Sequence, residues 1–216
     1  MRQLFVLLHG VAGVPEDLEP LGLALRVAFP GAAVLIPAGF APCETESGNQ
    51  WFCTQDDDGS GAPSLSDALP ALVDYVRAAQ RRLRLRGADT AIAGFSQGAV
   101  MALEAVHAHE GLAGRVLAFA GRYARLPTQA PRATTIHLLH GADDPVMPVH
   151  EARLAQNRLA QLRADATIDV ASRVGHELHP ALIQRAIVRL KTCVPLRSWE
   201  DALQVDPAMP AGTTLH

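Results

Sequence analysis

Short apolar runs alternate along the chain with longer segments in which apolar residues recur at helical spacing. The runs cover residues 4–8, 33–36, 90–94, 115–120, 135–139 and 166–171. The helical patterns lie between and after them, at residues 16–28, 65–85, 97–109, 150–163 and 180–193. Strands that alternate with helices build βαβ units around a parallel sheet. The pattern therefore predicts an α/β protein with one open, mostly parallel sheet of about six strands and helices on both faces.

Three places depart from this alternation. Residues 39–63 are rich in Gly, Pro, Ser and acidic residues and fit neither period, which predicts a long loop over the carboxyl ends of the strands. Loops of this length in compact domains are usually functional or mobile, and a mobile lid is one interpretation. Pro70 lies in the second helical pattern, so that helix either begins near residues 66–70 or kinks there. Residues 206–216 lack periodicity and are expected to form a surface tail.

Composition narrows the class of protein. The chain has 216 residues, 49% of them hydrophobic, and a net charge of −3, which predicts a single domain over residues 1–205. The scattered basic residues argue against nucleic acid as a partner. The first apolar run ends at His9 after five residues, which is too short for a secretory signal. No run is long enough to cross a bilayer, so stable membrane insertion is not expected.

The cysteines and one acidic run carry further expectations. Three cysteines, an odd number in a chain of this size, favour reduced thiols and a cytoplasmic location. A Cys43–Cys53 disulfide is the alternative. The acidic run from Asp56 to Gly59 lacks the spaced ligands of a calcium loop, so we interpret it as a solvated turn and expect no metal.

The most informative segment places Ser96 between Gly94 and Gly98, after an apolar run and at the start of a helical pattern. A serine on such a strand-to-helix bend adopts a strained backbone, and the flanking glycines remove Cβ atoms that would collide there. The bend exposes the hydroxyl and aims the amino end of the following helix at any oxyanion formed on a substrate. The segment matches the general description of a nucleophile elbow, so we predict Ser96 as the nucleophile of a serine hydrolase.

A serine nucleophile needs a base, and in α/β hydrolases the acid and the base follow the serine in that order. Asp144 lies in an acidic turn after the fifth apolar run and precedes a proline that restricts its backbone. Asp143 is the alternative acid. His176 falls in the loop after the last predicted strand, whereas His179, the alternative base, looks like the entry to the last helix. We predict Asp144 as the acid and His176 as the base.

Two further sets of residues are predicted around the nucleophile. Val11 follows the first strand in a glycine-rich turn, and its backbone N–H is expected to form an oxyanion hole with that of Gln97. The alternative is a glycine-rich strand-to-helix turn that has no role in catalysis. The side chains predicted to line the substrate, or else simply to pack, are Trp51, Phe52, Val146 and Met147.

Taken together, five segments resemble the phospholipase/carboxylesterase family of α/β hydrolases, which includes bacterial carboxylesterases and acyl-protein thioesterases. The resemblance extends from Leu4 to about Leu190 and implies a small, nearly lidless α/β-hydrolase fold with a Ser-Asp-His triad and no cofactor. It also implies hydrolysis of short to medium acyl esters, and since some members are dimers, a homodimer is one expectation. The segments are Leu8 to Val11, Trp51 with Phe52, Gly94 to Ala99, His140 to Pro148, and Gly175 with His176.

The chain departs from the family pattern in two respects. The family usually has strands before the His-Gly segment, so the resemblance implies a sheet trimmed at its N-terminal strands. The family also often has Asp after Trp-Phe, where this chain has Cys53. These departures leave Ser96, Asp144 and His176 in place and bear on the substrate pocket and the dimer surface.

The residues and the resemblance together predict a serine hydrolase that cleaves carboxylic esters or thioesters through an acyl-enzyme intermediate. The substrate is expected to be a small-molecule ester or an acylated protein. A lactonase or a peptidase on the same scaffold is the alternative enzyme, because one fold hosts many chemistries. A binding protein that has lost activity is the alternative from another class, although three intact triad residues argue against it.

Overall fold

One six-stranded sheet organises the molecule. A computed structural model of the chain describes residues 3–43, 47–53, 63–195 and 198. The strands follow the order β2-β1-β5-β6-β7-β8, and every neighbouring pair is parallel. The predicted open, parallel sheet is therefore confirmed. The bounds are Leu4–Leu8 (β1), Ala33–Leu35 (β2), Thr90–Phe95 (β5), Arg115–Phe119 (β6), Thr135–Gly141 (β7) and Ala166–Ala171 (β8).

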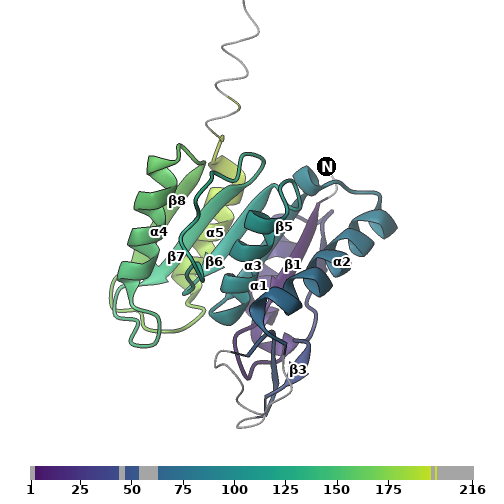
Figure 1. Ribbon diagram of the computed structural model, residues 1–216, viewed down its shortest axis with the longest axis horizontal. Helices are drawn as coiled ribbons and strands as arrows, with labels where there is room; N and C mark the ends of the chain where they lie inside the picture. Colours follow the sequence, from purple (N-terminus) through teal and green to yellow (C-terminus); the bar gives the residue numbers. More distant parts are fainter. Residues whose placement is uncertain (1–2, 44–46, 54–62, 196–197, 199–216) are drawn as a thin grey trace, which may run out of the picture.

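Helices cover both faces of this sheet, as predicted (Figure 1). Helices α1 (Glu19–Ala28) and α5 (Pro180–Thr192) bury their apolar residues against one face. Helices α2 (Leu65–Leu83), α3 (Gln97–Ala108) and α4 (Val149–Gln161) bury theirs against the other. Because side chains alternate across each strand, the sheet contributes to two separate apolar clusters. All loops after the strands gather at one edge, which is where parallel sheets bind ligands.

The structure differs from the prediction at two prolines: Pro20 moves the start of a helix, whereas Pro70 lies inside one. The pattern at 16–28 divides into a 3-10 turn, η1 (Pro15–Leu18), and α1, because Pro20 has no N–H to donate to the Glu16 carbonyl. Helix α2 begins at Leu65, where Ser64 accepts a hydrogen bond from the Asp67 N–H, and it continues through Pro70. A second 3-10 turn, η2 (Gly87–Asp89), precedes β5.

The predicted long loop contains regular structure that periodicity did not reveal. Strands β3 (Ala41–Pro42) and β4 (Asn49–Gln50) pair antiparallel, and Gly13 bridges to Asn49. In Figure 1, β3 lies beyond the end of the sheet opposite to the N-terminus. Two-residue strands are too short to produce an alternating pattern, which is why the prediction was wrong here. A lid formed by residues 39–63 stays a prediction, because 44–46 and 54–62 lie outside the described residues.

The described structure also bears on the expectations for the cysteines and for membrane-spanning helices. Cys43, Cys53 and Cys193 carry no disulfide, so the alternative bridge does not form. No helix within the described ranges is long and apolar enough to span a bilayer. The acidic run from Asp56 to Gly59 and the tail at 206–216 lie outside the described residues, and the extent of the single domain stays a prediction.

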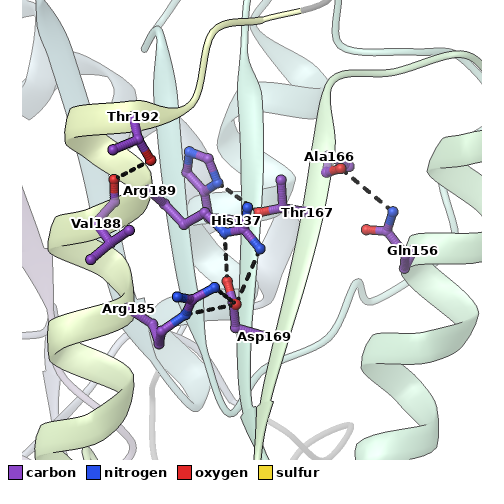
Figure 2. Close-up of polar contacts among 9 residues, drawn as sticks. All are labelled: His137, Gln156, Ala166, Thr167, Asp169, Arg185, Val188, Arg189 and Thr192. Atoms are coloured by element: carbon purple, nitrogen blue, oxygen red, sulfur yellow. Dashed lines mark hydrogen bonds and ion pairs between the residues drawn. The ribbon is translucent and has the colours of Figure 1, made fainter.

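A charged cluster lies between α5 and the sheet. Figure 2 shows Asp169 of β8 accepting hydrogen bonds from Arg185 and Arg189 of α5, at 2.7 to 3.1 Å. Burial acts to raise the pKa of Asp169, but the two guanidinium groups outweigh it and the pKa lies below its ordinary value. On the next strand, His137 is fully buried and its Nδ1 lies 2.8 Å from Thr167 Oγ1. Burial, aided by nearby arginines, lowers the pKa of His137 to about 4.

This buried histidine makes stability depend on pH. The pKa of His137 is about 4 in the folded protein, against its ordinary value of 6.5. Between these two pH values only the unfolded chain takes up the proton, so the stability of the folded protein falls as the pH decreases from 6.5 toward 4. We expect the stability advantage of the wild type over His137→Gln to shrink by about 2 kcal/mol between about pH 7.5 and about pH 5. Urea unfolding of the wild type and of His137→Gln at both pH values measures this change in the stability difference, and a difference independent of pH would contradict the prediction.

Candidate active site

Ser96 occupies a sharp bend between β5 and α3. Its backbone has φ 52° and ψ −115°, a left-handed conformation that costs about 1–3 kcal/mol for a residue with a side chain. The neighbouring glycines explain how the bend fits. A Cβ on Gly94 would lie 2.1 Å from the Gly98 carbonyl oxygen, and a Cβ on Gly98 would lie 2.2 Å from the Leu8 carbonyl oxygen. Both positions therefore require glycine, as the sequence analysis expected.

The structure brings Ser96, His176 and Asp144 together from three loops. His176 Nε2 lies 3.0 Å from Ser96 Oγ, and His176 Nδ1 lies 2.8 Å from Asp144 Oδ2. These residues follow β5, β8 and β7 respectively, so the carboxyl edge of the sheet assembles them. The two alternatives lie elsewhere. Asp143 is exposed, and His179 caps α5 by accepting the Ala181 N–H.

The Asp144 carboxylate has a fixed orientation. Oδ1 accepts the backbone N–H groups of Val146 and Met147 at 2.9 and 2.8 Å, which leaves Oδ2 facing His176. The side chain is shielded from solvent. Since a carboxylate only accepts, the network assigns the imidazole proton to His176 Nδ1. His176 Nε2 is then a free acceptor for the Ser96 hydroxyl proton.

Gly141 is a site residue that the sequence analysis missed. It ends β7, and a Cβ there would lie 2.3 Å from the Val174 carbonyl oxygen. The same carbonyl accepts the Asp143 N–H at 2.9 Å. The loop that carries Asp144 and the loop that carries His176 can therefore approach only because residue 141 has no side chain. A glycine two residues after the end of an apolar run was the available signal.

The backbone around Ser96 offers two N–H groups to an oxyanion. Gln97 begins α3, so its N–H has no partner within the helix. Val11 lies in the turn after β1 and is 48% exposed. That turn passes close to Ser96, because a Cβ on Gly10 would lie 3.5 Å from Ser96 Cβ. Within the described ranges, neither N–H donates a hydrogen bond. Their role as an oxyanion hole stays a prediction.

A buried network behind Ser96 holds these loops. Trp51 donates its backbone N–H to Gln97 Oε1 at 2.7 Å and its indole N–H to the His9 carbonyl at 2.8 Å. Gln97 Nε2 donates to the Phe52 carbonyl at 2.8 Å. His9 Nε2 accepts the Gly39 N–H at 2.9 Å, and burial lowers the pKa of His9, which keeps the ring neutral. The network ties the turn after β1 to the residue that follows the nucleophile.

The four side chains predicted to line the substrate occupy two different environments. Trp51 is fully buried and Phe52 nearly so, and both pack into the core beneath the site. Val146 is 65% exposed and Met147 is half-buried, on the turn that carries Asp144. Substrate contact by any of the four stays a prediction. The described residues contain no cluster of side chains suited to a metal ion.

A parallel sheet flanked by helices, with a serine on a strained strand-to-helix bend beside a histidine and an aspartate from later loops, defines an α/β hydrolase. Comparison with known proteins identifies the family. The chain matches the sequence profile of the Phospholipase/Carboxylesterase family over residues 1–194, and it belongs to that family.

Individual relatives agree. The chain is 38% identical over 203 residues to Esterase YpfH of Escherichia coli K12, covering 94% of this chain and 88% of that protein. Among solved structures, esterase PE8 superposes with a TM-score of 0.77 at 27% identity, covering 89% of this chain and 93% of that one. The Bacillus cereus carboxylesterase gives 0.74 at 19% identity, covering 88% of each chain, which shows a shared fold. The chain is therefore a hydrolase enzyme of the esterase type.

Proposed function

We propose that this enzyme hydrolyses carboxylic esters with short to medium acyl chains, or acyl thioesters, through an acyl-enzyme formed on Ser96. The observation that carries the proposal is the chain of hydrogen bonds from Asp144 through His176 to Ser96, at 2.8 and 3.0 Å. A hydroxyl is a weak nucleophile near neutral pH unless a base accepts its proton during attack. The 3.0 Å contact lies within the range required for that transfer.

The proposed reaction has two steps. Ser96 Oγ attacks the acyl carbon while its proton passes to His176 Nε2, and the backbone N–H groups of Val11 and Gln97 stabilise the oxyanion. The tetrahedral intermediate collapses, and His176 returns the proton to the departing alkoxide or thiolate. Water then attacks the acyl-enzyme with His176 again as base, which releases the acid and restores Ser96. Asp144 holds the imidazole in the tautomer that both steps need.

Two features support ester chemistry within this proposal. The relative at 38% identity is named an esterase. Exposed apolar side chains, including Val11 and Val146, lie on the turns next to Ser96 and Asp144. Apolar surface favours contact with an acyl chain over contact with a charged substituent. We also propose a small-molecule or acyl-protein ester as substrate and a cytoplasmic location, which three cysteines without a disulfide support.

A substrate comparison tests the proposal. We expect p-nitrophenyl esters of two to eight acyl carbons, or the matching acyl thioesters, to be hydrolysed with kcat/KM at least about 10³-fold above that of a peptide amide, because the amine expelled from an amide is a poorer leaving group than p-nitrophenolate or a thiolate. Labelling with a fluorophosphonate, followed by peptide mapping, should locate the adduct on Ser96. Faster cleavage of a lactone or an amide would favour the alternative enzymes, and absence of the adduct would refute covalent catalysis.

A further inference from the structure

A second histidine lies directly behind the acid. His140 is on β7, is 1% exposed, and has no role in the reaction proposed above. Its Nε2 lies 2.7 Å from the Met147 carbonyl oxygen and 3.5 Å from Asp144 Oδ2. Within the described part of the chain, its Nδ1 has no hydrogen-bond partner. The contact to Met147 is therefore the main polar interaction of a buried ring.

The protonation state of His140 follows from these contacts. Burial lowers the pKa of His140, although the Met147 carbonyl and the Asp144 carboxylate act in the opposite direction. The ring is then neutral near pH 7 and carries one proton. A carbonyl oxygen only accepts, so the network assigns that proton to Nε2. His140 thus donates to Met147, with the carboxylate of Asp144 close to the same N–H.

This donation closes a ring of contacts around the acid. Asp144 Oδ1 accepts the Met147 N–H, and the Met147 carbonyl accepts the His140 N–H, so the turn from Asp144 to Met147 is tied back to β7. The start of the turn has its own anchor, since the Asp143 N–H donates to the Val174 carbonyl. The far end of the turn, at Met147, is anchored by the hydrogen bond from His140. Without the contact to His140, Met147 and its N–H, one of the two N–H groups that orient Oδ1, would be freer to shift, and the direction of the carboxylate toward His176 would be held less firmly.

We propose that His140 is a positioning residue: by anchoring the Asp144–Met147 turn to β7, it holds the Asp144 carboxylate in line with His176. This inference rests on the proposed function, because it assigns His140 an effect on catalysis through Asp144. A displacement of about 1 Å in a reacting group can cost on the order of 10²-fold in rate. One buried hydrogen bond to a neighbouring turn is therefore sufficient to matter for turnover.

Two substitutions of equal length separate hydrogen bonding from packing. Gln at position 140 places an N–H donor the same number of bonds from Cα as His Nε2, whereas Met places a methyl group there. We expect His140→Met to lower kcat by about 10- to 100-fold with KM changed less than about twofold. Fluorophosphonate labelling of Ser96 should slow by the same factor. His140→Gln should recover most of the loss, to within about fivefold of the wild type.

His137 supplies a matched control, since it is a second buried histidine on the same strand with a different partner, Thr167. His137→Met should lower the melting temperature and leave kcat within about twofold of the wild type. Equal kcat in the wild type and His140→Met would overturn the inference, and so would a loss of kcat that Gln fails to recover in a folded protein. Should His140→Met not fold, a His140→Gln variant that is folded but more than about tenfold slower would also overturn it. A wild type that does not label at Ser96 would refute the proposed function instead.

Discussion

Replacing Ser96 with alanine is expected to lower kcat for esters by on the order of 10⁶-fold, as removal of the nucleophile does in serine hydrolases that work through a covalent intermediate. The alanine keeps the bend and the N–H of Gln97 but removes the hydroxyl oxygen that lies 3.0 Å from His176 Nε2. Residual turnover should come from the oxyanion donors and substrate binding alone. Steady-state kinetics measure the loss of turnover, and fluorophosphonate labelling independently measures the loss of the reactive hydroxyl.

Ser172 provides the control, because it is an exposed serine in the loop that carries His176. Ser172→Ala should label and turn over within about twofold of the wild type. Labelling that survives in Ser96→Ala would place the nucleophile on another residue. The bend at Ser96 would then be a structural feature of the fold without a catalytic role.

Exchanging Asp144 for asparagine should lower kcat by on the order of 10⁴-fold with little change in stability. The amide oxygen can still accept the N–H groups of Val146 and Met147, so the turn should persist. The amide NH₂ then faces His176 Nδ1, where Oδ2 now lies at 2.8 Å, and a donor there favours the tautomer with the proton on Nε2. In that tautomer Nε2 cannot accept the Ser96 proton. Kinetics at near-neutral pH and thermal unfolding test both parts.

Asp143→Asn is the matched comparison, since Asp143 is the neighbouring carboxylate and is exposed. It should change kcat less than about twofold. An Asp143 variant as slow as the Asp144 variant would indicate that charge near His176, rather than a directed hydrogen bond, supports catalysis. A large loss of stability in Asp144→Asn would instead assign the residue a structural role.

Much of the fold was predictable because each element carries its own pattern. Within the six-stranded sheet, the strands Leu4–Leu8 and Ala166–Ala171 were predicted to the residue, and the other four to within two residues at an end. The start of α1 differed more, at residue 19 where 16 was predicted, because the missing N–H of Pro20 changes a local hydrogen bond without altering the apolar spacing. The positions of Ser96, Asp144 and His176 were predictable since each follows a strand, and parallel strands bring such positions to one edge.

The residues that hold the site together were not predictable in this way. Gln97 reaches Trp51 across 46 positions, and Gly141 matters only because the loop after β8 approaches it. His140 contacts a turn only seven residues further along the chain, but the apolar pattern does not show that its ring bonds to that turn. The role of Trp51 was left open between substrate lining and packing, because aromatic residues in a loop suit both. No pattern along the chain distinguishes a loop tryptophan with its N–H bonded inside the core from one that faces a ligand.

The amino-acid sequence by itself determined the order along the chain of the helices and of the six strands of the main sheet, the glycines that permit the bend at Ser96, and the order in which Ser96, Asp144 and His176 follow one another. These features depend on residues that are neighbours in the chain or repeat at a fixed spacing. Only the tertiary structure decided which of Asp143 and Asp144 faces His176, which of His176 and His179 faces Ser96, and which buried groups hold them in place. Such choices depend on side-chain directions and on contacts between distant segments, which exist only once the sheet has brought its loops together.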